Sequence, residues 1–410
     1  MDNKRREKLK TINEKVFELA STIKLLSNVA WPIETQNEFL NHYSTGKAKL
    51  PEVAYQKINY DLEKNELLKL KQSFTADEPT EVYTIKNIES LLDAIELNHA
   101  IGTNSFTELS KKIFGVPGDT LPNSDVSIIT AAEQIINLAD EFYHPYVNPQ
   151  LDSFQAEDIK NYMEKRIHAI FKDEAPQIEI TDTLAAKATA TAKIIRLRKG
   201  PHFSHFDFKQ LFYHEIMTHA LTSLNGEAQP LLRSMGRGTL RTLRTQEGLA
   251  TFSEVVTGAM DIHRLKRLAL RTVAIDMALK GANFIETFEY FVSKNISLNE
   301  SFSSTQRIFR GGFPDKNIVF TKDSIYLDGL MNVHTLFRWA MKHNRIELTH
   351  LLFCGRVALE DLHLLESSYA EGLIIAPKFL PGWYAKIEIL AGSLMFSLLA
   401  NLIKINKDYD

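Results

Sequence analysis

At roughly 150 residues per domain, a chain of 410 residues predicts two to three domains, and its 44% hydrophobic and 24% charged residues are ordinary for a soluble globular protein. With 48 basic and 51 acidic residues, the net charge of -3 excludes the global positive field that holds nucleic acid. The single cysteine, Cys354, excludes an internal disulfide and a cysteine-based zinc cluster, and it fits a reducing compartment.

Two stretches of the sequence bear on localisation. Residues 2–8 are mostly charged, where a secretory signal has its apolar run. Residues 389–402 are the longest uncharged apolar stretch, shorter than the roughly 20 residues that cross a bilayer. We therefore expect a cytoplasmic, soluble protein that binds neither membrane nor nucleic acid, and we expect residues 389–402 to form a buried C-terminal helix.

The first third of the chain has helical patterns. Over residues 4–26, apolar residues recur at steps of three and four, as on one face of an amphipathic helix, and the pattern ends at Trp31-Pro32. Similar patterns cover residues 60–70, 88–99 and 128–142. Turn-rich segments lie at residues 115–119 and 144–149. A soft boundary near residues 145–160 predicts a helical N-terminal region, 1–155, and a second domain, 156–410.

The pattern changes after Pro176. Residues 177–181 alternate as a strand does, and residues 189–198 are rich in β-branched residues and end at Gly200-Pro201. A helix follows, with Asp207 as the predicted N-cap and Gln210 completing a capping box. Phe206 and Leu211 stand at the two positions of a hydrophobic staple.

That helix carries two histidines separated by five positions, in His214-Glu215-Ile216-Met217-Thr218-His219. The known zinc helix, H-E-x-x-H, places its histidines one turn apart at i and i+4. On a regular α-helix, about 100° per residue would turn the rings at i and i+5 roughly 140° apart, too far to share one ion. In a regular helix, therefore, at most one of the two binds a metal.

A π-bulge would change this conclusion. One extra residue in the turn returns i+5 to about the direction of i+4, and such bulges are frequent at functional sites. Thr218 supports this interpretation because its hydroxyl can bond a freed carbonyl. We predict a bulge between Ile216 and Thr218. His202 and His205, just upstream, are expected to be ordinary histidines rather than ligands.

A catalytic zinc needs a third protein ligand and an open position for water. The candidate is Glu247, at the start of a second predicted helix, where the small residues Gly248 and Ala250 permit close approach. Glu254, two turns further on, is either a rival ligand or an acceptor that orients a histidine.

Together, the pattern His214-Glu215-x-x-x-His219 and the run Gln246-Glu247-Gly248-Leu249-Ala250 resemble the QEGLA-motif proteins, a family that includes the eukaryotic microtubule-associated tyrosine carboxypeptidases. The likeness extends to Arg310-Gly311-Gly312 and to Phe320-Thr321-Lys322-Asp323-x-x-Tyr326-Leu327-x-Gly329, and so covers roughly residues 180–340. It implies a zinc metallopeptidase that holds one ion with His214, His219 and Glu247 and uses Glu215 as base. It also implies removal of a C-terminal residue, tyrosine in the eukaryotic branch.

The expected fold is a predominantly helical α+β fold with a zincin-like core, in which a small sheet precedes the metal-binding helix. Zinc held by two imidazoles and one carboxylate lowers the pKa of its water toward ~7, and Glu215 is placed to take the proton. The oxyanion needs a second donor, for which Tyr326 is the candidate and His334 the runner-up.

A carboxypeptidase must also bind the terminal carboxylate of its substrate, and Arg310 and Lys322 are the candidates. Four further arginines form either a solvated face or a docking surface for an acidic peptide tail: Arg233, Arg237, Arg241 and Arg244. The basic residues of the second predicted strand either protect a sheet edge or flank a backbone that aligns the substrate: Lys193, Arg196, Arg198 and Lys199.

Three hypotheses follow. The first is a zinc-dependent peptidase of the carboxypeptidase type, acting on the C-terminal tail of a peptide or protein. The second is an inactive zinc-binding protein whose N-terminal region packs against a partner. The third is a helical adaptor without metal. The presence of Glu215 and of a third ligand favours the first over the second.

Overall fold

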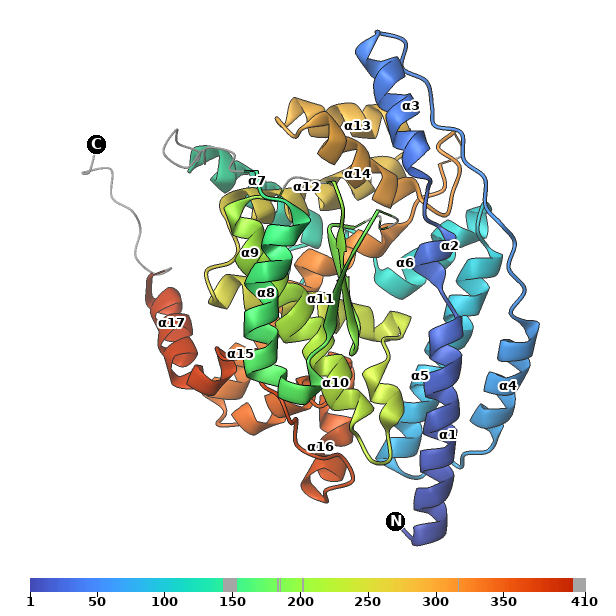
Figure 1. The fold of residues 1–410 in the computed structure, drawn as a ribbon, viewed down its shortest axis with the longest axis vertical. Coiled ribbons are helices and arrows are strands. Elements are labelled where there is room, and N and C mark those ends of the chain that lie inside the picture. Colours follow the sequence, from blue (N-terminus) through green and yellow to red (C-terminus); the bar gives the residue numbers. More distant parts are fainter. Residues whose placement is uncertain (143–152, 183, 185, 201–202, 316, 401–410) are drawn as a thin grey trace.

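The computed structural model describes all residues except 143–152, 183, 185, 201–202, 316 and 401–410, and side chains only up to residue 397. The fold is α+β and predominantly helical, as expected (Figure 1). The predicted turn at residues 144–149 and His202 lie outside the described residues.

The N-terminal part contains seven helices: α1 (Asn3–Thr22), α2 (Leu25–Asn28), α3 (Ile33–Ser44), α4 (Asp61–Gln72), α5 (Pro79–His99), α6 (Asn104–Phe114) and α7 (Ile128–Glu141). Figure 1 shows α1, α4 and α5 side by side on one flank of the molecule. The helix predicted over residues 4–26 ends at Thr22, because Ile23 is extended. The helix predicted over 88–99 begins earlier, with Pro79 at its first position, where proline has no N–H to lose.

The small sheet lies in the chain between α8 (Ala156–Phe171) and the helix that carries His214 and His219. Its strands are β1 (Gln177–Thr181), β2 (Ala188–Ala190) and β3 (Ile194–Arg198), in the order β1-β3-β2. β1 runs parallel to β3, with Ile178 opposite Ile195, and β2 runs antiparallel to it, with Ala188 opposite Leu197. The strand predicted over 189–198 is therefore two strands joined by a turn at residues 191–193.

This split corrects the interpretation of the basic residues there. β3 is the central strand, so both of its backbone edges are paired, and it neither forms a sheet edge nor offers a free edge to a substrate. Arg196 instead pairs across strands with Glu179, with 3.1 Å between Nε and Oε2. The sequence pattern could not show this, because β-branched residues favour strand without indicating where a turn interrupts it.

The second half of the chain forms the helical body around the sheet. Its longer elements are α9 (His205–Leu211), η3 (Phe212–Ala220), α10 (Leu221–Glu227), α11 (Leu243–Val256), α12 (Ile262–Leu279), α13 (Phe284–Ser293), α14 (Leu298–Phe309), α15 (Ile325–Lys342), α16 (Leu362–Ala370) and α17 (Ile387–Ala400). Short 3-10 turns lie between them: η2 (Lys172–Glu174), η4 (Arg233–Gly236), η5 (Leu240–Thr242), η6 (Thr321–Ser324), η7 (Ile346–Leu352), η8 (Leu359–Asp361) and η9 (Tyr384–Lys386).

The hydrophobic core is built from residues of both halves of the chain. One apolar cluster joins Leu9 and Tyr83, from the N-terminal helices, to Ile195 of the sheet, Ile216 of η3 and Phe252 of α11. A second cluster packs α7 against α12, α13 and α14. The helix that carries His214 and His219 thus lies between elements from both halves of the chain, which fixes its position through burial.

The C-terminal helix differs from the expectation. In α17, Leu390 and Leu394 are buried, but Ile389, Met395 and Phe396 are 67%, 70% and 68% exposed. Only one stripe of the helix is covered, so the prediction of a buried helix is wrong, and residues 401–402 lie outside the described part. Among the described helices, none is long and apolar enough to cross a membrane.

Candidate metal centre

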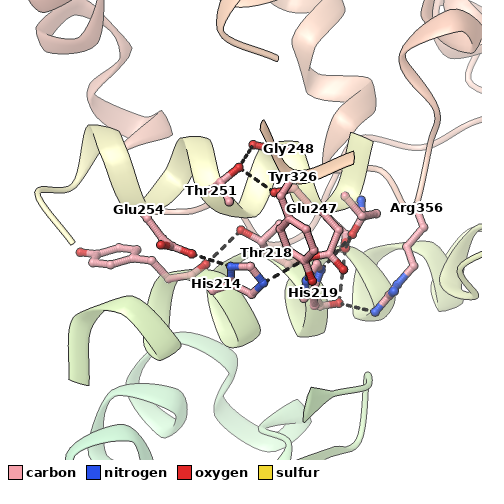
Figure 2. Close-up of polar contacts among 12 residues, drawn as sticks. His214, Thr218, His219, Glu247, Gly248, Thr251, Glu254, Tyr326 and Arg356 are labelled. Carbon is pink, nitrogen blue, oxygen red and sulfur yellow. Dashed lines mark hydrogen bonds and ion pairs between the residues drawn. The ribbon is translucent and has the colours of Figure 1, made fainter. Parts of the chain in front are cut away.

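The helix with the two histidines is a π-helix over Phe212–Ala220. It follows α9 directly and continues into α10. The predicted π geometry is confirmed, and it covers nine residues rather than a single bulge. As a result, the rings of His214 and His219 come together on one side, with centroids 4.9 Å apart and planes at 86° (Figure 2).

Thr218 supports this distortion as the sequence predicts. Its hydroxyl donates to the carbonyl of Tyr213, five residues earlier, at 3.0 Å. The start of the preceding helix is a correction. Ser204 is the N-cap, and Asp207 stands at N3, where its carboxylate accepts from the Ser204 N–H at 2.7 Å. The capping box is therefore formed by Ser204 and Asp207, and not by Asp207 and Gln210, because the helix begins three residues earlier than expected.

Glu247 lies in the first half of α11, which packs across the π-helix. Its Oε2 is 3.4 Å from His214 Nε2 and 3.8 Å from His219 Nε2. One ligand atom from each of the three side chains lies within 4.8 Å of the other two. Bonds of about 2.0–2.1 Å to a tetrahedral zinc would place two ligand atoms roughly 3.4 Å apart, so this spacing fits one ion.

Glu247 also has an unsatisfied atom. Its Oε2 is buried and makes no hydrogen bond, which a bound cation would compensate. Burial opposes its charge, but Lys322 and the two histidines lower the pKa of Glu247 well below its usual range. The carboxylate is therefore ionised, and two imidazoles with one carboxylate are a donor set typical of zinc.

Glu254 orients His214 rather than taking a ligand position in this arrangement. Its Oε1 is 2.6 Å from His214 Nδ1, which leaves Nε2 facing Glu247. Glu254 is itself fully buried and is held by Arg264, at 3.1 Å, and by Gln210, at 3.0 Å. Burial opposes its charge, yet Arg264 and His214 lower the pKa of Glu254 to about 2. It is a permanent anion behind the ring.

Gln246 stands behind the other histidine. Its Oε1 is 3.4 Å from His219 Nδ1 and accepts a hydrogen bond from the Thr222 hydroxyl at 3.0 Å. Neighbouring residues of the run Gln246-Glu247 therefore play two parts: one faces the candidate ion and the other faces the back of a candidate ligand. Both histidines thus have a partner on Nδ1 (Figure 2).

A family model described as microtubule-associated tyrosine carboxypeptidase matches residues 37–402, nearly the whole chain. The chain belongs to this family. The resemblance drawn from the two metal motifs is thereby confirmed, and the match extends well beyond residues 180–340. A comparison with curated proteins found no match.

In this member of the tyrosine carboxypeptidase family, Glu215 lies between the two histidines in sequence and is 9% exposed. Burial raises the pKa of Glu215, and the neighbouring His214 and His219 oppose this shift. A carboxylate whose pKa is raised toward neutrality is a better proton acceptor for water than an ordinary one.

Tyr326 lies at the first turn of α15 and points toward Glu247 and His219 (Figure 2). Its hydroxyl accepts a hydrogen bond from Arg307 at 3.2 Å, and Lys322 Nζ is 5.0 Å from the centre of its ring. His334, two turns further along α15, stacks edge-on against Phe252 at 6.1 Å. Among the described residues, no contact joins His334 to the three candidate ligands.

The two candidates for binding a carboxylate are placed differently. Lys322 is buried, with Nζ 3.7 Å from Glu247 Oε1, so its charge stabilises the carboxylate of this candidate ligand. Arg310 is also buried, and its guanidinium lies over the ring of Phe320 at 5.4 Å. Its Nε has no hydrogen bond, and within the described part of the chain it forms no ion pair. Burial lowers the pKa of Arg310 to about 10, so it still carries a positive charge at neutral pH.

The four arginines from Arg233 to Arg244 each have an acidic partner within the chain. Arg241 Nη1 is 2.6 Å from Asp361 and Arg244 Nε is 2.9 Å from Asp328. Arg233 pairs with Glu14 at 2.7 Å and Arg237 with Glu227 at 3.9 Å. Arg241 is mostly buried. This pairing disfavours the docking surface, although substrate contacts of Arg241 and Arg244 stay a prediction.

Arg356 is a residue near the centre that the sequence did not indicate. Its Nη2 donates to the His219 carbonyl at 3.3 Å (Figure 2). Its Nε donates to Ser223 Oγ at 2.9 Å. It lies 137 positions after His219. Only its neighbour in sequence, Gly355, is a signal of close packing, and that signal does not point to the metal centre.

Proposed function

We propose that the protein is a zinc-dependent carboxypeptidase. The observation that carries the proposal is the buried set of His214, His219 and Glu247, whose ligand atoms face one another at the spacing of a tetrahedral ion, with Glu215 adjacent. When bound, zinc would polarise the scissile carbonyl and lower the pKa of a coordinated water toward ~7. The family's name, tyrosine carboxypeptidase, supports the reaction class.

Glu215 is proposed as the general base. Its carboxylate takes a proton from the attacking water and passes it to the leaving amine, so that the peptide nitrogen departs neutral. The buried position and the raised pKa of Glu215 suit this exchange. Glu254 and Gln246 hold the two imidazoles in place behind it.

Two further side chains are proposed to hold the substrate. The hydroxyl of Tyr326, fixed by Arg307, donates to the oxygen on which negative charge develops, and we favour it over His334 because Tyr326 points toward the ligands. Arg310, a buried cation without an acidic partner among the described residues, binds the terminal carboxylate.

The proposed substrate is the C-terminal tail of a peptide or protein. The residue removed is tyrosine or another aromatic residue, as the family's name suggests. An acidic tail fits the cations around the centre, among which Arg310 has no acidic partner within the described residues.

The alternative is an inactive zinc-binding protein with a regulatory role. It predicts a bound metal without turnover, so two measurements separate it from the enzyme. Metal analysis of protein purified without added zinc should give one zinc per chain. Mass spectrometry of a peptide library with varied C-terminal residues should show single-residue trimming that a chelator abolishes.

The variant E215Q tests the base. It should retain zinc, because Glu215 is not among the three ligands, and it should lose activity by at least about 100-fold, in the range of general-base removal. E286Q, at a helix cap remote from the centre, is the matched control and should keep full activity. A rate for E215Q equal to that of the wild type would eliminate the proposed base, and zinc bound without turnover by the wild type would favour the regulatory alternative.

A further inference from the structure

Arg356 has no part in the proposed chemistry, yet its backbone is fixed by two separate elements. Its N–H donates to the carbonyl of Met235 in η4 at 2.7 Å, and its own carbonyl accepts from the Tyr83 hydroxyl of α5 at 3.4 Å. A Cβ at Gly355 would lie 2.6 Å from the Met235 side chain, so only glycine fits there. The arginine therefore starts from a position that packing determines.

From this position the side chain reaches the point where the π-helix ends. One of its acceptors, the His219 carbonyl, belongs to the last residues of the π-helix, and the other, Ser223 Oγ, belongs to the first turn of α10. The guanidinium therefore spans the junction between η3 and α10.

Side-chain donors gather at this junction, where i→i+5 hydrogen bonding returns to i→i+4. Thr222 supplies one hydroxyl, shared between the Thr218 carbonyl at 2.7 Å and the His219 carbonyl at 3.3 Å. Arg356 adds a charged donor to the His219 carbonyl, and a charged donor makes a stronger hydrogen bond than a neutral one.

The ligand at this junction is also the less firmly held of the two. His214 has a charged carboxylate 2.6 Å behind its ring, whereas His219 has only the neutral amide of Gln246 at 3.4 Å. The direction of the His219 ring therefore depends more on its backbone. Within the described residues Arg356 forms no ion pair with a carboxylate, and its guanidinium donates hydrogen bonds to His219 and Ser223, while Glu247 and Glu215 act on its charge from a greater distance.

We propose that Arg356 is a positioning residue of the metal centre: by bridging His219 and Ser223 it holds the end of the π-helix so that His219 keeps facing the ion. The proposal rests on the proposed function, because it takes His219 as a metal ligand. It assigns Arg356 to the metal site and not to the substrate.

The test compares R356M and R356K with the wild type and with R345M. Arg345 pairs with Glu347 and Glu366, away from the centre, and is the matched control. Zinc affinity is measured by chelator competition, and amide hydrogen exchange is measured over residues 214–225 in metal-free protein. We expect R356M to bind zinc at least about tenfold more weakly, as when an outer-sphere partner is lost, and to exchange faster. We expect R356K to lie in between and R345M to match the wild type.

The outcomes are distinct. If the wild type binds no zinc, the proposed function is wrong and this inference falls with it. If the wild type binds zinc and R356M has the same affinity and exchange, only the inference is overturned. A higher KM for R356M at unchanged zinc affinity also overturns it, in favour of substrate binding. If R356M does not fold, R356K decides: an affinity at least about threefold weaker supports the proposal, and the affinity of the wild type contradicts it.

Discussion

Single contacts determine how each candidate ligand is oriented. The 2.6 Å contact between Glu254 and His214 leaves only one ring nitrogen free to face Glu247. We therefore expect E254Q to weaken zinc binding by roughly 10- to 100-fold, because the anion that orients the ring is lost while the three ligands remain. Chelator competition measures this.

The control for E254Q is E300Q, which removes a partly exposed carboxylate that pairs with another arginine of α12, Arg267, at 2.6 Å. It should keep the zinc affinity of the wild type. An E254Q protein with unchanged affinity and unchanged thermal stability would show that His214 needs no such partner.

Cys354 gives a second prediction at this scale. It is fully buried, and burial raises the pKa of its thiol to about 12. Since the thiolate is the reactive form, the native protein should not react with a chromogenic disulfide reagent at pH 8. In guanidinium chloride one thiol per chain should react at once. Rapid labelling of the native protein would contradict the burial of this residue.

The three candidate ligands could be chosen from the sequence, but the partners of these residues could not. His214, His219 and Glu247 are candidates because few residue types bind metal ions and their spacing allows them to meet. The contacts of Gln246 and Arg356 do not follow, because an amide or a guanidinium has many uses and only the fold brings it near one acceptor. The same reason explains why Arg241 proved to pair with Asp361.

At the scale of elements, the approach of α11 to α15 positions Glu247. A Cβ at Gly248 would lie 2.3 Å from the backbone of Gly329, and one at Gly329 would lie 2.3 Å from the Arg244 carbonyl. The two helix backbones therefore touch, as the small residues after Glu247 predict. The glycines of two separate sequence motifs meet at this contact.

The variant G248A should therefore push the helices apart. We expect a loss of about 1–3 kcal/mol in the free energy of unfolding, as for other overpacked contacts, together with weaker zinc binding because Glu247 moves with the helix. G392A is the matched control, since it is also helical and nothing lies within 4 Å of its added Cβ. Urea denaturation measures the stability of both variants, and chelator competition measures their zinc binding. Equal stability of G248A and G392A would refute the close contact.

The π-helix shows how much a local sequence pattern can predict. Histidines five positions apart, with a threonine between them, favour a π-turn if both rings bind one ion, and the structure has one. Its length of nine residues could not be predicted, since it depends on packing against α11 and on the donors at its end. The strand predicted over residues 189–198 shows the opposite limit, because its residues favour strand on both sides of an unrecognised turn.

At the scale of the whole molecule, buried ion pairs connect distant elements near the centre. Asp323 of η6 binds Arg307 of α14 at 2.9 Å and lies 3.7 Å from Arg271 of α12. Burial would raise the pKa of Asp323, but Arg307 and Lys322 lower it well below its usual range. Its contribution to stability is therefore fully present above the pKa of the unfolded chain, about 3.9, and is lost as the pH falls through the lower folded value.

The direction of this pH dependence can be tested. D323N should unfold at lower urea than the wild type at pH 7. The difference between the two midpoints should shrink as the pH falls below about 4, because the unfolded wild type then binds a proton at Asp323 that the folded protein does not. D276N removes a carboxylate from an exposed helix pair with Lys280 and should match the wild type closely at both pH values. A difference in urea midpoint between D323N and the wild type that does not depend on pH would contradict the stabilising role of the ionised Asp323 carboxylate.

The N-terminal region takes part in the same core. Leu9 and Tyr83 share an apolar cluster with Ile216 of the π-helix, and α7 packs on α12. Phe17 of α1 lies under the guanidinium groups of Arg233 and Arg237, at 4.4 and 4.3 Å. The division at residue 155 stays a prediction, and these contacts indicate that the region supports the helix that carries the candidate ligands.

The sequence by itself determined the fold class, the family resemblance, the candidate ligands and the need for a π-turn, because these depend on residue types and short spacings. Only the tertiary structure decided that Glu254 and Gln246 stand behind the histidines, that the basic residues pair internally, that α17 is half exposed and that Arg356 reaches His219. Each of these depends on which surfaces pack together across the chain, and burial, unlike periodicity, is a property of the whole fold.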